Sequence, residues 1–164
     1  MKFLNESVKQ GVGVLVAVIL TLDGVLHAYW ASGHVWPAAD PRALILAILN
    51  IDDPSLARPG VVGPLAGLLF LTALLVLARV GLVGGRERLI PQVGLQVVVL
   101  AVAAGAFART VAGIIWALGL GADPATQFYK LNLILYTPAC FLLFAAAAIA
   151  ATARYSPENK GSQV

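Results

Sequence analysis

Four apolar stretches, each long enough to cross a lipid bilayer, constrain the fold of this 164-residue chain more than any other feature. A helix needs about 20 consecutive apolar residues to span a hydrocarbon core of ~30 Å. The sequence predicts such spans at about residues 9–32, 62–83, 92–118 and 125–153. Hydrophobic residues make up 60% of the chain and charged residues only 12%, which is unlike a water-soluble domain. We therefore expect one membrane domain over residues 1–164, an all-α integral membrane protein that forms an antiparallel four-helix bundle.

The segment between the first two spans, residues 33–61, is predicted to be a long external loop. It holds four of the nine prolines and three aspartates. Its apolar centre, residues 43–49, is too short to cross a bilayer. We expect this centre to form a short helix at the membrane interface.

The distribution of lysine and arginine predicts that both termini are cytoplasmic. Seven of the eleven basic residues lie at the amino end, in the loop between spans 2 and 3, or in the tail: Lys2, Lys9, Arg79, Arg86, Arg88, Arg154 and Lys160. Arg42 and Arg58 lie on the other side, with Lys130 at its edge. Cytoplasmic loops of membrane proteins carry an excess of these residues. This placement accounts for the net charge of +3, so we do not expect nucleic acid as a partner.

The first span ends in a stripe of ionisable and aromatic side chains. Its members are Asp23, His27, Trp30 and His34. Because successive residues of a helix turn by about 100°, all four are predicted to share one face. Ionisable groups inside a span are costly unless they face a partner or a water-filled cavity, so they indicate a functional site.

The third and fourth spans carry polar residues at a matching depth. Arg109 stands on a predicted face of small residues that recur every four positions: Ala101, Gly105 and Gly113. Asn132 and Tyr136 share a face of the fourth span. At about 1.5 Å per residue, these groups fall in the same outer half of the membrane as Asp23 and His27. An unpaired charge there would cost roughly 2.5–3.5 kcal/mol, so we expect Asp23 or a neighbouring polar group to neutralise Arg109.

These three faces are predicted to converge on an outward-facing polar pocket. The predicted ligand-binding residues are Asp23, His27, Trp30, Arg109, Asn132 and Tyr136. The alternative is that the polar side chains only hold the helices together, at about 0.6 kcal/mol each. The sequence alone leaves both interpretations open.

The sequence favours a binding role over an enzyme and predicts no cofactor and no metal site. Within one chain, His27 and His34 lie on one predicted helix and cannot ligate opposite sides of a haem iron, and a zinc site lacks a third ligand of the usual kind. Ser32 lies near His27 without a recognisable nucleophile elbow. Cys140 is the single cysteine, which excludes disulfide chemistry within the chain.

Three segments of the sequence resemble a known protein family. Residues 26–33 (LHAYWASG) are similar to the His-x-Tyr-Trp-Ala-x-Gly-Gly signature of small four-span bacterial membrane proteins, a domain of unknown function. The likeness continues over residues 109–113 and 128–138. His34 stands where the signature has its second glycine, and Asn132 stands where the pattern has an acid. The resemblance implies four helices and a location in the bacterial inner membrane, and it implies no established activity.

Three functions remain open at this point. The first is a protein that binds a small polar molecule or lipid headgroup in the polar pocket among spans 1, 3 and 4. The second is a non-catalytic accessory subunit whose alanine and glycine faces dock onto a larger membrane complex. The third is a small proton-coupled exporter with Asp23 as the proton carrier, although pairing with Arg109 would hold that acid ionised. The partners considered are the lipid bilayer and either a larger membrane complex or further copies of the chain.

Overall fold

The computed structural model describes residues 5–83 and 91–153, and within these ranges the chain is helical with no strand. Four helical segments are long and apolar enough to cross a membrane: α1 (Glu6–Ala31), α3 (Pro59–Arg79), α4 (Gln92–Ala117) and the segment Gln127–Ala151. A helix satisfies its own backbone hydrogen bonds, which lipid cannot do. The predicted all-α architecture with four membrane-spanning helices is confirmed, and each helix lies within a few residues of its predicted span.

The fourth segment is not one regular helix. It consists of α5 (Gln127–Leu131), a wider π-helical turn η2 (Asn132–Tyr136) and α6 (Thr137–Ala151). Pro138 has no backbone N–H and cannot donate to the carbonyl of the preceding turn, which explains the irregular hydrogen bonding at this position. Asn132 and Tyr136, two predicted site residues, are therefore the first and last residues of the wide turn.

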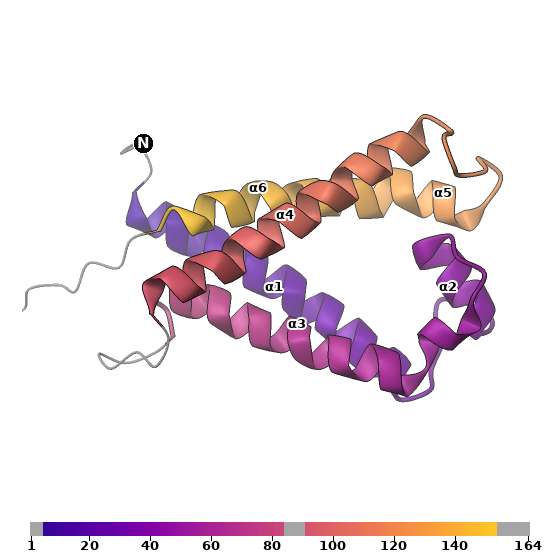
Figure 1. Cartoon of the computed structure of the whole chain (residues 1–164), viewed down its shortest axis with the longest axis horizontal. Helices are drawn as coiled ribbons and strands as arrows, with labels where there is room; N and C mark the ends of the chain where they lie inside the picture. Colours follow the sequence, from indigo (N-terminus) through magenta and orange to yellow (C-terminus); the bar gives the residue numbers. More distant parts are fainter. Residues whose placement is uncertain (1–4, 84–90, 154–164) are drawn as a thin grey trace, which may run out of the picture.

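The long helices are arranged as two pairs. Helix α1 packs along α3, α4 packs along α6, and further contacts join α1 to α6 and α3 to α4. Figure 1 shows the pairs close together at the end that carries the amino terminus and spread apart toward α2. Glycines of α1 permit its close approach to α3, since a Cβ at Gly13 would lie 2.6 Å from Val80 and one at Gly24 would lie 2.9 Å from Phe70.

At the end where the pairs converge, side chains of all four long helices form one core, and we call this end the closed half. Its buried residues are Val16, Ala17, Leu20, Ala73, Val76, Val80, Val99, Ala103, Ala146, Ala147, Ala150, Ala151 and Ala153. Most of them are alanine, which lets helix backbones approach closely. Ala146, Ala147, Ala150 and Ala151 of α6 are thus buried inside the bundle.

Arg79 ties three helices together at the closed end. It lies in the last turn of α3 and is only 6% exposed. Its Nη1 donates to Gln92 Oε1 at 2.8 Å and its Nη2 donates to the Ala151 carbonyl at 2.9 Å, near the end of α6. A cation is favourable beside the carbonyls that end a helix. Five other basic residues used to predict the topology lie outside the described ranges: Lys2, Arg86, Arg88, Arg154 and Lys160.

The short helix α2 (Pro41–Leu49) covers the predicted apolar centre of the long loop. Asp40 caps its first turn by accepting a hydrogen bond from the Ala43 N–H at 2.8 Å, the usual role of an N-cap carboxylate. Asn50 ends it in the left-handed conformation at φ 58°. A short 3-10 turn, η1 (Pro54–Ala57), connects it to α3.

Helix α2 connects the two spread pairs, and we call the end where it lies the polar half. Leu44 of α2 is buried with Trp30 of α1 and Val62 of α3, so α2 rests on the first pair through an apolar core. It reaches the second pair through hydrogen bonds. Tyr136 Oη donates to the Ala47 carbonyl at 3.3 Å, and Asn50 Nδ2 donates to the Gly121 carbonyl at 3.0 Å.

Candidate functional site

Arg109 is the centre of a polar cluster between α4 and η2. Its Nη1 donates to Asn132 Oδ1 at 3.1 Å. Its guanidinium carbon lies 4.8 Å from the ring centre of Trp116 and 5.6 Å from that of Tyr136. A cation over an aromatic face is attracted by the ring quadrupole. The structure therefore brings three predicted site residues together, and Trp116, seven residues after Arg109 on the same helix, joins them.

Asn132 orients this cluster. Its side chain is fully buried. The amide oxygen accepts from Arg109 and also from Thr137 Oγ1 at 3.1 Å, while Nδ2 donates to the Gly113 carbonyl at 2.8 Å. The three contacts fix which end of the amide faces the guanidinium. A Cβ at Gly113 would collide with Thr137 Oγ1, so α4 and η2 can approach this closely only because position 113 is glycine.

The wide turn η2 explains why Thr137 belongs to the site. Residues five apart in a regular helix point about 140° away from each other. In η2 the turn is wider, and the hydroxyl of Thr137 reaches the amide of Asn132, five residues earlier. A regular helical projection of the sequence therefore misses this residue, although Pro138 beside it is a recognisable signal for an irregular turn.

The polar residues of α1 form a second, separate group. Asp23 Oδ1 lies 3.2 Å from His27 Nδ1, and the same ring nitrogen lies 2.9 Å from the Asp23 carbonyl. The His27 ring meets the edge of Trp30 at 5.0 Å between ring centres. Trp30 is buried among α1, α2 and α3, and its Nε1 donates to the Trp36 carbonyl at 2.9 Å. Trp30 thus supports α2, and Asp23 and His27 carry the polar atoms of this group.

Of the two partners expected for Arg109, Asp23 or a neighbouring polar group, the structure shows the second: Asn132 accepts from the guanidinium, and Asp23 does not pair with it. Among residues 5–83 and 91–153, Asp23 pairs with His27 one turn further along its own helix, and Arg109 has no carboxylate at ion-pair distance. Each group is instead satisfied locally, Asp23 by its neighbour four residues on and Arg109 by an amide and two rings.

Comparison with known protein families identifies the family of this chain. A family model described as "Protein of unknown function (DUF3995)" matches residues 20–149. The chain belongs to this family. All six predicted site residues lie within the match, and the expected membership of an uncharacterised family is confirmed. No curated protein and no solved structure matches the chain.

Two further expectations for this DUF3995 protein need correction. His34 does not continue the stripe, because α1 ends at Ala31; its ring stacks on Tyr29 at 4.6 Å. Ala101 and Gly105 do not share the face of Arg109's cluster, since Ala101 is exposed and a Cβ at Gly105 would meet open space. A spacing of four residues advances by about 400°, so a face drawn in such steps drifts by 40° each time.

The chemistry available at Arg109 is anion recognition. A guanidinium has five N–H donors. Within the described parts of the DUF3995 chain, Nε and Nη2 of Arg109 donate to no protein acceptor, and neither atom is among the buried polar atoms without a partner. These two nitrogens therefore reach the protein surface. The same described residues contain no group of three metal-ligating side chains.

Proposed function

We propose that this membrane protein binds the anionic group of a small polar molecule or lipid headgroup at Arg109, in the polar half of the bundle. One observation supports the proposal above all. The guanidinium is partly buried at membrane depth and, among the described residues, every partner it has is neutral. A charge in the bilayer costs roughly 2.5–3.5 kcal/mol, and a bound anion offsets that cost.

The cluster presents the guanidinium in one orientation. Asn132 holds Nη1, and the guanidinium carbon lies over the rings of Trp116 and Tyr136. The edge formed by Nε and Nη2 is left for two parallel hydrogen bonds to a phosphate or carboxylate, the geometry that arginine makes best. With both termini in the cytoplasm, which we propose from the positive-inside rule, this edge belongs to the outer half of a bacterial inner membrane.

Binding of two phosphate probes by the purified protein in neutral detergent tests the proposal. The probes are glycerol 3-phosphate, which is water-soluble, and dihexanoylphosphatidylglycerol, which carries short acyl chains. The signal is the tryptophan fluorescence of the wild type minus that of Trp116→Phe. We expect saturable binding of at least one probe, weakened at least about tenfold by Arg109→Gln, because charge-assisted hydrogen bonds are lost.

The matched control removes another cation from the same half of the bundle. Lys130 is exposed and lies two residues before Asn132. Lys130→Gln should leave binding unchanged if Arg109 is a specific site. Equal losses in both variants, or no saturable signal with either probe, would overturn the proposal and favour a purely structural role for the cluster.

A second candidate function is proton-coupled export with Asp23 as the proton carrier. One observation favours it: Asp23 pairs with His27 and not with Arg109, and its side chain is 49% exposed. The pairing with Arg109 that would count against this function is therefore absent among the described residues. In proteoliposomes with an imposed pH gradient and an internal pH dye, wild-type protein should carry protons faster than Asp23→Asn. Equal proton flux in the two would eliminate this candidate.

A further inference from the structure

The depth of Arg109 places the proposed anion site below the level of the lipid headgroups. Arg109 is the eighteenth of the 26 residues of α4. With α4 centred in the bilayer and a rise of 1.5 Å per residue, its Cα lies about 7 Å beyond the midplane, inside a hydrocarbon half-layer of about 15 Å. Its guanidinium meets Trp116, two turns closer to the end of the helix, so the side chain extends toward the headgroups.

Helix α2 covers the end of the bundle above this site. It rests on the α1–α3 pair through Leu44. Its Ala47 carbonyl accepts from Tyr136 of η2, and Asn50, which ends it, donates to the Gly121 carbonyl in the loop between α4 and α5. Figure 1 shows α2 lying between the spread ends of the two pairs. A solute arriving from the water beyond this end meets α2 first.

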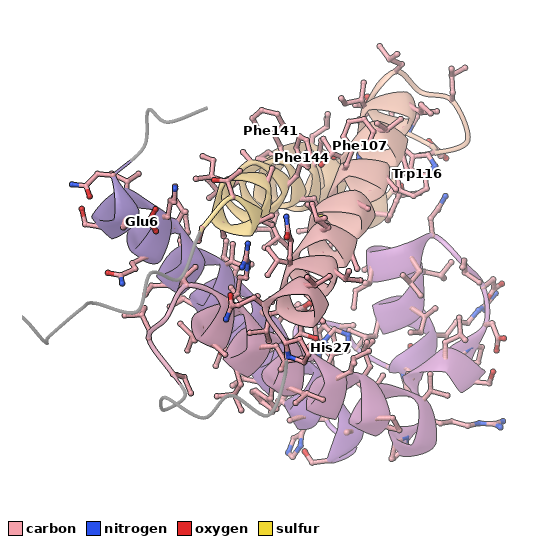
Figure 2. The ribbon with its side chains drawn as sticks, turned by 60° about the vertical axis from the view of Figure 1, so that its left-hand side comes forward. Glu6, His27, Phe107, Trp116, Phe141 and Phe144 are labelled. Atoms are coloured by element: carbon pink, nitrogen blue, oxygen red, sulfur yellow. The ribbon has the colours of Figure 1, made fainter. Side chains whose placement is uncertain are left out.

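The sides of the polar half are apolar and contain no core shared by the two pairs. The second core contains buried residues of α1, α2 and α3 and none of α4 or α6. Every exposed residue of α4 between positions 101 and 115 is apolar. Figure 2 shows Phe107, Phe141 and Phe144 gathered on one side of the α4–α6 pair, and Trp116 on a different side of α4 near its end. Acyl chains match such a surface, and a hydrated free ion does not.

We infer that the anion at Arg109 is the phosphate of a membrane lipid, which reaches the guanidinium sideways from the bilayer, beneath α2. This inference rests on the proposed function and names the class of its ligand. The lipid brings its negative charge to the required depth while its chains stay in the hydrocarbon. Arg109 then donates two hydrogen bonds to the phosphate from Nε and Nη2, and the rings of Trp116 and Tyr136 form an aromatic wall beside it.

The experiment uses the full chain in nanodiscs of phosphatidylcholine that contain a minor fraction of a lipid with brominated chains. Bromine quenches a nearby indole, so the quenching of Trp116, taken as wild type minus Trp116→Phe, reports which lipid sits at the site. We expect brominated phosphatidylglycerol to quench Trp116 at about tenfold lower mole fraction than brominated phosphatidylcholine. Arg109→Gln should abolish the preference and Lys130→Gln should preserve it.

The outcomes separate the two proposals. If glycerol 3-phosphate in water binds in an Arg109-dependent way and no lipid preference is seen, the lipid inference is wrong and the proposed function stands. If the binding of neither probe depends on Arg109, the lipid inference and the proposed function are both wrong. A preference that persists in Arg109→Gln reflects general attraction of anionic lipid and also overturns the inference. Should Arg109→Gln fail to fold, Arg109→Lys replaces it, since an ammonium cannot form the two-point contact; a wild-type preference in that variant contradicts the inference.

Discussion

The closed half and the polar half of the bundle are built from the same four helices and treat an arginine in opposite ways. In the closed half, Arg79 is buried and bonded to Gln92 and to the Ala151 carbonyl. In the polar half, Arg109 is bonded to Asn132 and lies beside aromatic rings, and two of its nitrogens reach the surface. The first arginine joins helix ends, and the second presents donors. Burial and the choice of partner, more than charge, separate a structural arginine from a candidate binding residue.

The two halves also differ in the size of the side chains that pack inside them. Alanine fills most of the core of the closed half, which allows the helix pairs to converge. Bulky side chains such as Trp116 and Tyr136 occupy the polar half, where the pairs spread apart and α2 connects them. Substitutions in the closed half should therefore change stability, and substitutions in the polar half should change binding.

The largest expected effect on stability is overpacking of the closed half. Ala147 is 0% exposed in the four-helix core. Ala147→Leu should lower the free energy of unfolding by about 3 kcal/mol, at the upper end of the usual cost of inserting carbons into a packed core. Unfolding in mixed micelles measures the loss, with Ala104→Leu on the exposed side of α4 as the control. If both variants are equally stable, the closed half is not the tightly packed region described here.

A smaller effect is expected where α4 meets η2. Gly113→Ala places a Cβ against Thr137 and Asn132 and should cost about 1–2 kcal/mol while also displacing the amide that orients Arg109. Gly105→Ala adds the same atom where nothing lies within 4 Å and should be neutral. The same unfolding assay compares the two. Equal tolerance at both positions would contradict the close approach of α4 and η2.

Much of the fold could be predicted because membrane spans are long and chemically distinctive. The four apolar stretches and the short helix of the loop follow from length and composition, and the observed helices match them. Arg109, Asn132 and Tyr136, whose matching depth predicts that they converge, lie together in the structure. The bridging role of α2 could not be predicted, because it depends on hydrogen bonds between Tyr136 and Ala47, which are far apart in sequence.

The predicted site failed where regular helical geometry or simple charge pairing did not apply. Thr137 was missed because the wide turn changes the angular step between residues. The pairing of Asp23 with Arg109 was inferred from matching depth alone, and depth does not say which way a side chain faces. His27, four residues from Asp23, was a nearer partner on the same helix.

Separation of the two polar groups predicts a small effect for Asp23→Asn. Because no ion pair joins Asp23 to Arg109 among the described residues, anionic lipid binding should change by less than about twofold. The loss of the partly exposed contact with His27 should cost less than about 1 kcal/mol of stability. The nanodisc quenching assay measures the first effect. Abolished binding in this variant would show that the two groups form one site after all.

The smallest expected effect concerns the loop that carries α2. Arg42 pairs with Asp52, and this hydrogen bond lowers the pKa of the Asp52 carboxyl below its ordinary value of 3.8. A lowered pKa stabilises the folded state above the unfolded-state pKa, and the contribution is lost as the pH falls through the folded-state value. Asp52→Asn should therefore lower the melting temperature slightly at pH 6, and the difference should shrink as the pH falls below 3.8. A pH-independent difference would show that the pair does not titrate with folding.

No carboxylate lies at ion-pair distance from Arg109 in the described chain, and Asn132→Asp tests most directly whether this leaves the guanidinium free to bind an anion. The substitution places an acid at the position that holds Nη1 of the guanidinium, so it neutralises the cation without removing it. The measurement is Trp116 quenching by brominated phosphatidylglycerol in nanodiscs, with folding verified by helical circular dichroism. We predict that the preference for the anionic lipid disappears in the folded variant. Wild-type preference in folded Asn132→Asp would contradict the account.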